Sequence, residues 1–116
     1  MKESDFKNQN YTVIGINNSI SGELELSGEV IVHSKVKGTI TVKDEGKLVI
    51  ERDSYIEGTI YCHDIEVFGE IQGNINAQGK LTVRSSARIS GGVNANQMAV
   101  YPGATLNIEA HAEDTI

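Results

Sequence analysis

Val36-Lys37-Gly38-Thr39-Ile40-Thr41-Val42, followed shortly by Leu48-Val49-Ile50, is the stretch of sequence that decides the fold. Apolar and other residues alternate within it, which is the period of a β-strand with one buried face. The first part is a ladder of the form apolar-x-Gly-x-apolar-x-small, and the second part is an apolar doublet. Both recur along the chain, with ladders that begin at Ile20, Val36, Ile56, Ile71 and Ile89.

The doublets return about every seventeen positions, which is the period typical of a solenoid. They are Ile14/Ile16, Val30/Val32, Leu48/Ile50, Ile65/Val67, Leu81/Val83 and Met98/Val100. Their second members are separated by 16, 18, 17, 16 and 17 residues. We therefore predict an all-β fold, a single parallel β-helix of about six coils with about 17 residues in each coil.

The chain of 116 residues has room for one such domain. We predict a β-helix over residues 11–108, flanked by short disordered tails. Residues 1–10 are polar with mixed charge and are expected to form a flexible N-terminal tail, and residues 109–116 are expected to form an acidic C-terminal tail. Pro102 lies in the turn signal Tyr101-Pro102-Gly103, directly after the last doublet.

Composition excludes several classes of protein. The formal net charge is −6 and the ten basic residues are scattered, so no basic face for nucleic acid is expected. A single cysteine excludes an internal disulfide framework. No stretch approaches the roughly eighteen apolar residues of a membrane span, and residues 1–10 lack the apolar segment of a secretory signal. The expected location is the cytoplasm.

Two motifs superficially suggest chemistry. The segment Gly73–Leu81 resembles a phosphate loop, but five residues separate its glycines and Leu81 follows Lys80 where Ser or Thr is required. Cys62 and His63 are adjacent, and strand alternation therefore places Cys62 inside and His63 outside. We expect Cys62 to be a buried core residue, and we predict no catalytic, cofactor-binding or metal-binding residue, so the chain is not expected to be an enzyme.

Two other β-solenoid functions were weighed against the spacing. Hexapeptide acyltransferases place apolar residues six apart, as Ile20, Leu26 and Val32 do, but Val36 follows only four residues later. Ice-binding solenoids present stacked Thr-x-Thr rows, and Thr39-x-Thr41 alone has that form.

The order of several short motifs resembles the bactofilins. The motifs are Thr12–Gly15, Ile20–Leu24, Leu48–Ile50, Tyr55–Ile60, Val67–Ile75, Ala87–Gly91 and Tyr101–Ala104. The resemblance covers about residues 11–108. It implies a right-handed β-helix that polymerises end to end without nucleotide as a bacterial cytoskeletal protein. It also implies cell-wall or morphogenesis proteins as partners, and a place at the inner face of the cytoplasmic membrane.

The chain departs from this family pattern at both termini. Many family members carry Phe-x-Gly in the last coil, where this chain has Leu106-Asn107-Ile108. Many also carry an apolar or basic N-terminal segment that targets the membrane. Here Phe6 is the one large apolar side chain of residues 2–10, and one such side chain buries too little surface to anchor a protein. Direct membrane binding is therefore not expected.

The first and last coils of a β-helix expose unpaired backbone groups unless a cap covers them. No helical pattern precedes Tyr11 or follows Ile108, so we expect each end to stack on a second copy of the chain. The predicted polymerisation interface is Ile14 and Ile16 in the first coil and Leu106 and Ile108 in the last. Contact between like ends gives a non-polar filament and head-to-tail contact a polar one, and the sequence does not choose between them.

Two other functions stay open from the sequence. The first is a β-solenoid binding module that does not polymerise and recognises a protein or a glycan. The second, ranked below it, is an enzyme of the acyltransferase kind.

Overall fold

The computed structural model describes residues 11–14 and 19–115, with side chains described for residues 19–109. In this part of the chain every strand pairs in parallel with its neighbours. The strands are β1 (Tyr11–Ile14), β2 (Ser19–Val32), β3 (Lys35–Ile50), β4 (Tyr55–Cys62), β5 (Asp64–Val67), β6 (Glu70–Val83), β7 (Arg88–Val100) and β8 (Thr105–Thr115).

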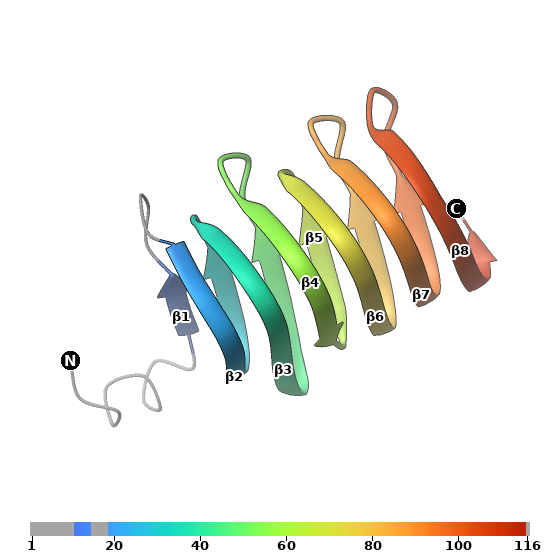
Figure 1. The fold of residues 1–116 in the computed structure, drawn as a ribbon. Helices are drawn as coiled ribbons and strands as arrows, with labels where there is room; N and C mark the ends of the chain where they lie inside the picture. Colours follow the sequence, from blue (N-terminus) through green and yellow to red (C-terminus); the bar gives the residue numbers. More distant parts are fainter. Residues whose placement is uncertain (1–10, 15–18, 116) are drawn as a thin grey trace.

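The strands wind into a β-solenoid of about five turns with about 17 residues per turn. In Figure 1 the chain passes downward in front and upward behind as it advances from β1 to β8, which makes the coil right-handed. Parallel strands that are joined within one sheet have this hand almost without exception. The predicted fold class is therefore confirmed.

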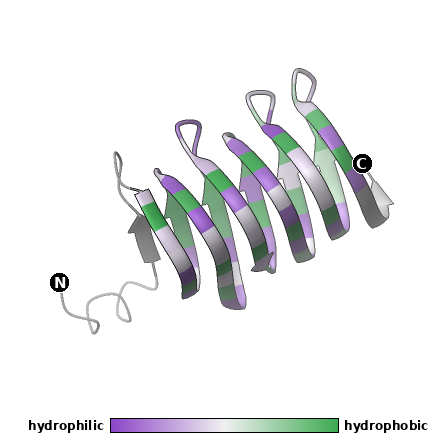
Figure 2. Ribbon diagram, viewed as in Figure 1, coloured by the Kyte–Doolittle hydropathy of each residue, from purple (hydrophilic) through white to green (hydrophobic). Residues whose placement is uncertain are grey.

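The pairing register places each residue directly over its counterpart in the next coil. Val36 pairs with Ile56, and Ile56 pairs with Ile71. All three side chains are fully buried, as are those of Ile40, Ile60 and Ile75 in a parallel column. Each such burial contributes about 1.5–3 kcal/mol, so the core is a bundle of apolar columns along the axis. Figure 2 shows the alternation of apolar and polar residues that produces it.

The structure corrects the sequence analysis at both termini. The register pairs Thr12 with Val30 and Ile14 with Val32, so the doublet of the first coil is Thr12 and Ile14, not Ile14 and Ile16. At the other terminus β8 continues to Thr115, beyond the expected end of the β-helix at residue 108. In this extension Ala110 pairs with Val93 and Ala112 pairs with Ala95, so the backbone register continues past residue 108.

The glycine ladder is explained by the backbone of the preceding coil. Gly58 has a φ of 144°, and a Cβ there would overlap the carbonyl oxygen of Gly38 in that coil. Glycine is the residue that adopts this conformation without strain. The column therefore bends the wall where successive backbones approach most closely.

The longest coil accommodates its extra residues in a bulge. Asp44, Glu45 and Gly46 of β3 lie opposite Gly28 alone, where the register between β2 and β3 shifts. Asp44 and Glu45 adopt left-handed φ angles of 61° and 57°. The bulge absorbs the additional length, so that Lys47 and Leu48 return to register with Glu29 and Val30.

We expect Gly58→Ala to destabilise the fold far more than Gly22→Ala. Both glycines have positive φ, so alanine is strained at either site by about 1–3 kcal/mol. Only at Gly58 does the new Cβ also meet backbone, because nothing lies within 4 Å of a Cβ at Gly22. Thermal unfolding followed by circular dichroism at low protein concentration measures the difference. Equal losses would show that backbone contact does not explain the glycine column.

Candidate functional site

Both ends of the β-helix expose strand edges that have no partner in the described part of the chain. At the N-terminal end β1 covers only Glu29–Val32 of β2, which leaves Ser19–Ser27 paired on the β3 side alone. At the C-terminal end β8 is paired only with β7. Such edges present rows of free backbone donors and acceptors, which are templates for pairing with another chain.

The apolar columns are also open at the N-terminal end. Ile20, Leu24 and Leu26 of β2 are half-buried and pack against the core. Val36 and Ile40, which lie directly over Ile20 and Leu24 in the next coil, are fully buried. The change from complete to partial burial within one coil shows that no residue in the described part of the chain fully covers these columns.

The C-terminal end is open in the same way. Leu106 and Ile108 of β8 are half-buried and pack against the core. Val100 occupies the same inward column as Val83, yet Val100 is 37% exposed whereas Val83 is fully buried. Tyr101 follows it and is 44% exposed. Half-exposed apolar residues gathered at one end of a molecule mark an interaction surface.

Of the four residues predicted to form the interface, Leu106 and Ile108 lie at the open C-terminal end. The backbone of Ile14 lies in β1, the terminal strand of the other end, and Ile16 lies outside the described residues. The sequence analysis did not identify Ile20, Leu24 and Leu26 as end residues, because it treated the coil before them as complete and expected that coil to cover them. Val100 was identified as an inward residue, but its exposure depends on where β8 runs.

The two ends differ in backbone shape. Ile108 pairs with Gly91, so the glycine column stops one coil before the C-terminal end. At the opposite end Gly22 still has the positive φ of the column, at 119°. The sequence departs from the family pattern at the same place, because Leu106-Asn107-Ile108 has Ile108 where Phe-x-Gly has glycine. The ends therefore present different surfaces to a second copy.

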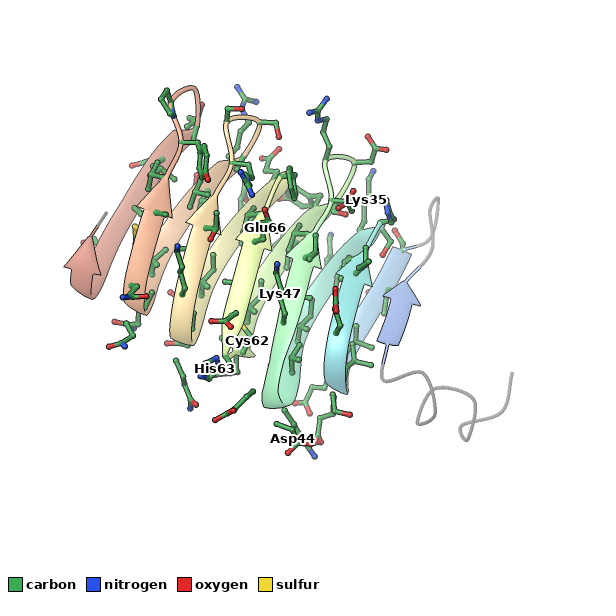
Figure 3. The ribbon with its side chains drawn as sticks, turned by 180° about the vertical axis from the view of Figure 1, so that it is seen from behind. Lys35, Asp44, Lys47, Cys62, His63 and Glu66 are labelled. Atoms are coloured by element: carbon green, nitrogen blue, oxygen red, sulfur yellow. The ribbon has the colours of Figure 1, made fainter. Side chains whose placement is uncertain are left out.

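Cys62 and His63 do not form a reactive pair. The Cys62 side chain is 5% exposed and belongs to the core, as predicted, whereas His63 is half-exposed with Nδ1 3.3 Å from Asp64 Oδ1. Burial, with a smaller contribution from the Asp64 carboxylate, raises the pKa of the Cys62 thiol from 9.0 to about 12. Figure 3 shows both residues at the corner that follows β4. A neutral thiol of this kind is a poor nucleophile.

A cluster on the outer surface joins three coils. Glu66 accepts a hydrogen bond from Arg84 Nε at 2.6 Å. Its other carboxylate oxygen lies 3.3 Å from Lys47 Nζ, and Figure 3 labels Glu66 and Lys47 on neighbouring coils. Burial opposes ionisation of Glu66, but the two cations outweigh it and lower the pKa of this carboxyl group. Arg84 also stacks over the Tyr101 ring at 4.5 Å. One carboxylate is shared by two cations from the coils on either side of it, so the cluster ties three coils together.

A groove of about 650 Å³ lies over β2, β3, β4 and β6, and its lining mixes Lys35 and Lys37 with Tyr55, Glu57 and Glu70. Tyr55 donates a hydrogen bond to Glu57 at 3.2 Å. Among the residues that the structure describes, no group of three or more His, Cys, Asp or Glu side chains could hold a metal ion. Within the same residues, no helix has the length and apolar character needed to cross a bilayer.

Cys62 is expected to be unreactive in the folded protein. A pKa of about 12 makes the thiolate fraction at pH 8 lower by roughly three orders of magnitude than that of an unperturbed thiol. Dithiobis(nitrobenzoate) added at pH 8 should label the protein only after guanidinium unfolding. Rapid stoichiometric labelling of the folded protein would contradict the assignment of Cys62 to the core.

Comparison with known proteins identifies the family. A family model described as bactofilin, polymer-forming cytoskeletal, matches residues 12–111. Bactofilin BacO of Myxococcus xanthus (strain DK1622) is 30% identical over 95 residues, which are 82% of this chain and 74% of that protein. No solved structure matches the chain significantly. The family match includes every inner coil and both open ends, and the chain therefore belongs to the bactofilin family of cytoskeletal scaffold proteins.

Proposed function

We propose that this chain assembles end to end into filaments without nucleotide, and that these filaments support cell shape and organise the cell envelope. The observation that carries the proposal is the pair of open ends, where half-buried apolar columns lie beside unpaired strand edges. A second copy stacked on either end pairs with the free strand edge and covers the half-buried apolar columns. Membership of a polymer-forming family supports the same conclusion.

The size of an end face is sufficient for a specific contact. The principal extents of the molecule are 39 × 27 × 22 Å. An end face therefore measures on the order of 500 Å², and two faces in contact bury about 1,000 Å² in total, which is the lower limit of specific interfaces. Apolar burial at about 25 cal/mol per Å² and ladder hydrogen bonds supply the free energy. Neither contribution requires nucleotide hydrolysis.

Assembly should proceed in EDTA and without ATP or GTP. The reason is that the proposed contact uses only apolar burial and backbone hydrogen bonds. High-speed sedimentation and negative-stain electron microscopy of the purified protein measure it, and addition of nucleotide or Mg²⁺ should change neither the yield nor the filament form. Filaments that form only after nucleotide is added would contradict the proposal.

Leu106→Arg should leave the β-helix folded and abolish long filaments. An arginine at this half-buried end position can reach water in a free monomer but is buried without a partner in a stacked junction. Asn107→Arg is the matched control, because it adds the same charge to the neighbouring exposed residue, which faces outward. Circular dichroism checks the fold, and analytical ultracentrifugation measures the size of the assemblies.

The product of Leu106→Arg also reports the polarity of assembly. End-paired dimers would show that like ends meet, because only the C-terminal contact is lost, whereas monomers would show head-to-tail stacking. Long filaments of Leu106→Arg would show that this end is not an assembly surface. Leu24→Arg applies the same test at the N-terminal end, where Leu24 is half-buried.

A further inference from the structure

One corner of the β-helix carries a column of side chains that runs to the C-terminal end. We call it the corner column, and its members directly follow the inner doublets of successive coils. The backbone amide of each member after the first donates to the last doublet residue of the preceding coil, as Tyr101 does to Val83 at 2.9 Å. The members of the corner column are His33, Glu51, Phe68, Arg84 and Tyr101.

Neighbouring members of the corner column interact through their side chains. His33 Nε2 lies 3.9 Å from a carboxylate oxygen of Glu51. The Arg84 guanidinium lies over two aromatic rings, 5.7 Å from the centroid of Phe68 and 4.5 Å from the centroid of Tyr101. A cation over the face of an aromatic ring is attracted to it. Tyr101 is the last member in the described chain and is 44% exposed, so it has a column neighbour there on the Arg84 side alone.

Arg84 is itself held in place by the preceding coil. Its Nε donates to a carboxylate oxygen of Glu66 at 2.6 Å, and only 14% of the Glu66 side chain is exposed. An arginine fixed in this way presents a flat guanidinium face on which an aromatic ring can stack. Figure 1 shows the corner between β6 and β7 beside the corner between β7 and β8, and Thr105 N donates to Ala87 O across them at 3.0 Å. The Glu66 cluster therefore reaches the last coil through Arg84.

We propose that Tyr101 is a contact residue of the junction at the C-terminal end, and that Arg84 is the residue that positions it. This inference rests on the proposed function, because it requires molecules to stack end to end. In a junction the second copy supplies the next member of the corner column, and the Tyr101 ring packs between that member and Arg84. An exposed tyrosine that is not held samples several rotamers, and ordering it at a contact weakens binding. Arg84 selects one rotamer before the contact forms.

The position of Tyr101 selects a second copy as its partner. Val100 precedes it and is 37% exposed, and Leu106 and Ile108 of the same end are half-buried. Tyr101 therefore borders the apolar columns that axial stacking is proposed to cover. Tyrosine is enriched at protein interfaces because it combines apolar area with a polar hydroxyl group.

Arg84→Gln and Lys47→Gln provide a matched test. Each change removes one of the two cations that share the Glu66 carboxylate. Of these two cations, Arg84 is the one that lies over Tyr101, so a purely structural role of the cluster predicts the same effect for both variants. High-speed sedimentation over a range of protein concentrations measures the critical concentration for assembly. Thermal unfolding below that concentration measures the stability of the fold.

Arg84→Gln should raise the critical concentration roughly three- to tenfold, because a ring that is not held must be ordered at the junction. Lys47→Gln should leave it within about twofold of the wild type, because an exposed ion pair contributes little. Tyr101→Phe keeps the ring and should assemble like the wild type, whereas Tyr101→Ser should raise the critical concentration at least as far as Arg84→Gln. Adding Arg84→Gln to Tyr101→Ser should raise it no further, because the two residues act as one unit.

The inference is overturned if Arg84→Gln and Lys47→Gln raise the critical concentration equally, or if either Arg84→Gln or Tyr101→Ser assembles like the wild type. If Arg84→Gln does not fold, Arg84→Lys takes its place, because it keeps a charge beside Glu66 but lacks the flat face that stacks on the ring. A wild-type protein that forms no filaments at any concentration would instead refute the proposed function on which the inference depends.

Discussion

Close stacking of one coil on the backbone of the next is the constraint on which the rest of this structure depends. At the glycine column the approach is so close that a single Cβ at Gly58 would overlap the carbonyl oxygen of Gly38. The same register puts Ile40, Ile60 and Ile75 over one another and removes them completely from water. Coil length can vary, as at the Asp44–Gly46 bulge, only where the register is recovered before the next inward residue.

This way of building a core leaves its two ends incomplete. Within the stack each column residue is covered from both sides, whereas Leu24 and Leu106 have a neighbour on one side only in the described chain. In a globular domain such residues would lie under a loop or a helix. Here the surface that best completes either end is another stacked coil, so the interaction that folds the molecule is also the one proposed to join molecules.

The period of the apolar residues was sufficient to predict the fold, and alternation alone placed Cys62 inside and His63 outside. The ends were harder to predict, because they depend on pairing between residues far apart in the sequence. The sequence cannot show that β1 covers only Glu29–Val32, which is why Ile20 was not recognised as an end residue. Thr12 is polar, so the apolar pair Ile14 and Ile16 was taken as the first doublet, two residues later than the register places it.

The C-terminal end shows a second limit of sequence reasoning. Glu109 and the acidic residues near the terminus dominate the composition of residues 109–116 and led to the prediction of a tail. The signal for a strand was present in the alternating residues Ala110 and Ala112, which pair in register with Val93 and Ala95. Two alanines offer too little apolar area to stand out in a pattern search. Their role becomes visible only when the neighbouring strand is in place.

Electron cryo-microscopy of the assembled filament tests the central claim most directly. The account predicts that strands continue across each junction between molecules at the spacing found within them, about 4.8 Å. It also predicts that Leu24 and Leu106 are enclosed at the junctions. A reconstruction in which the molecules touch only through their side walls, with β2 and β8 facing solvent at both ends, would contradict it.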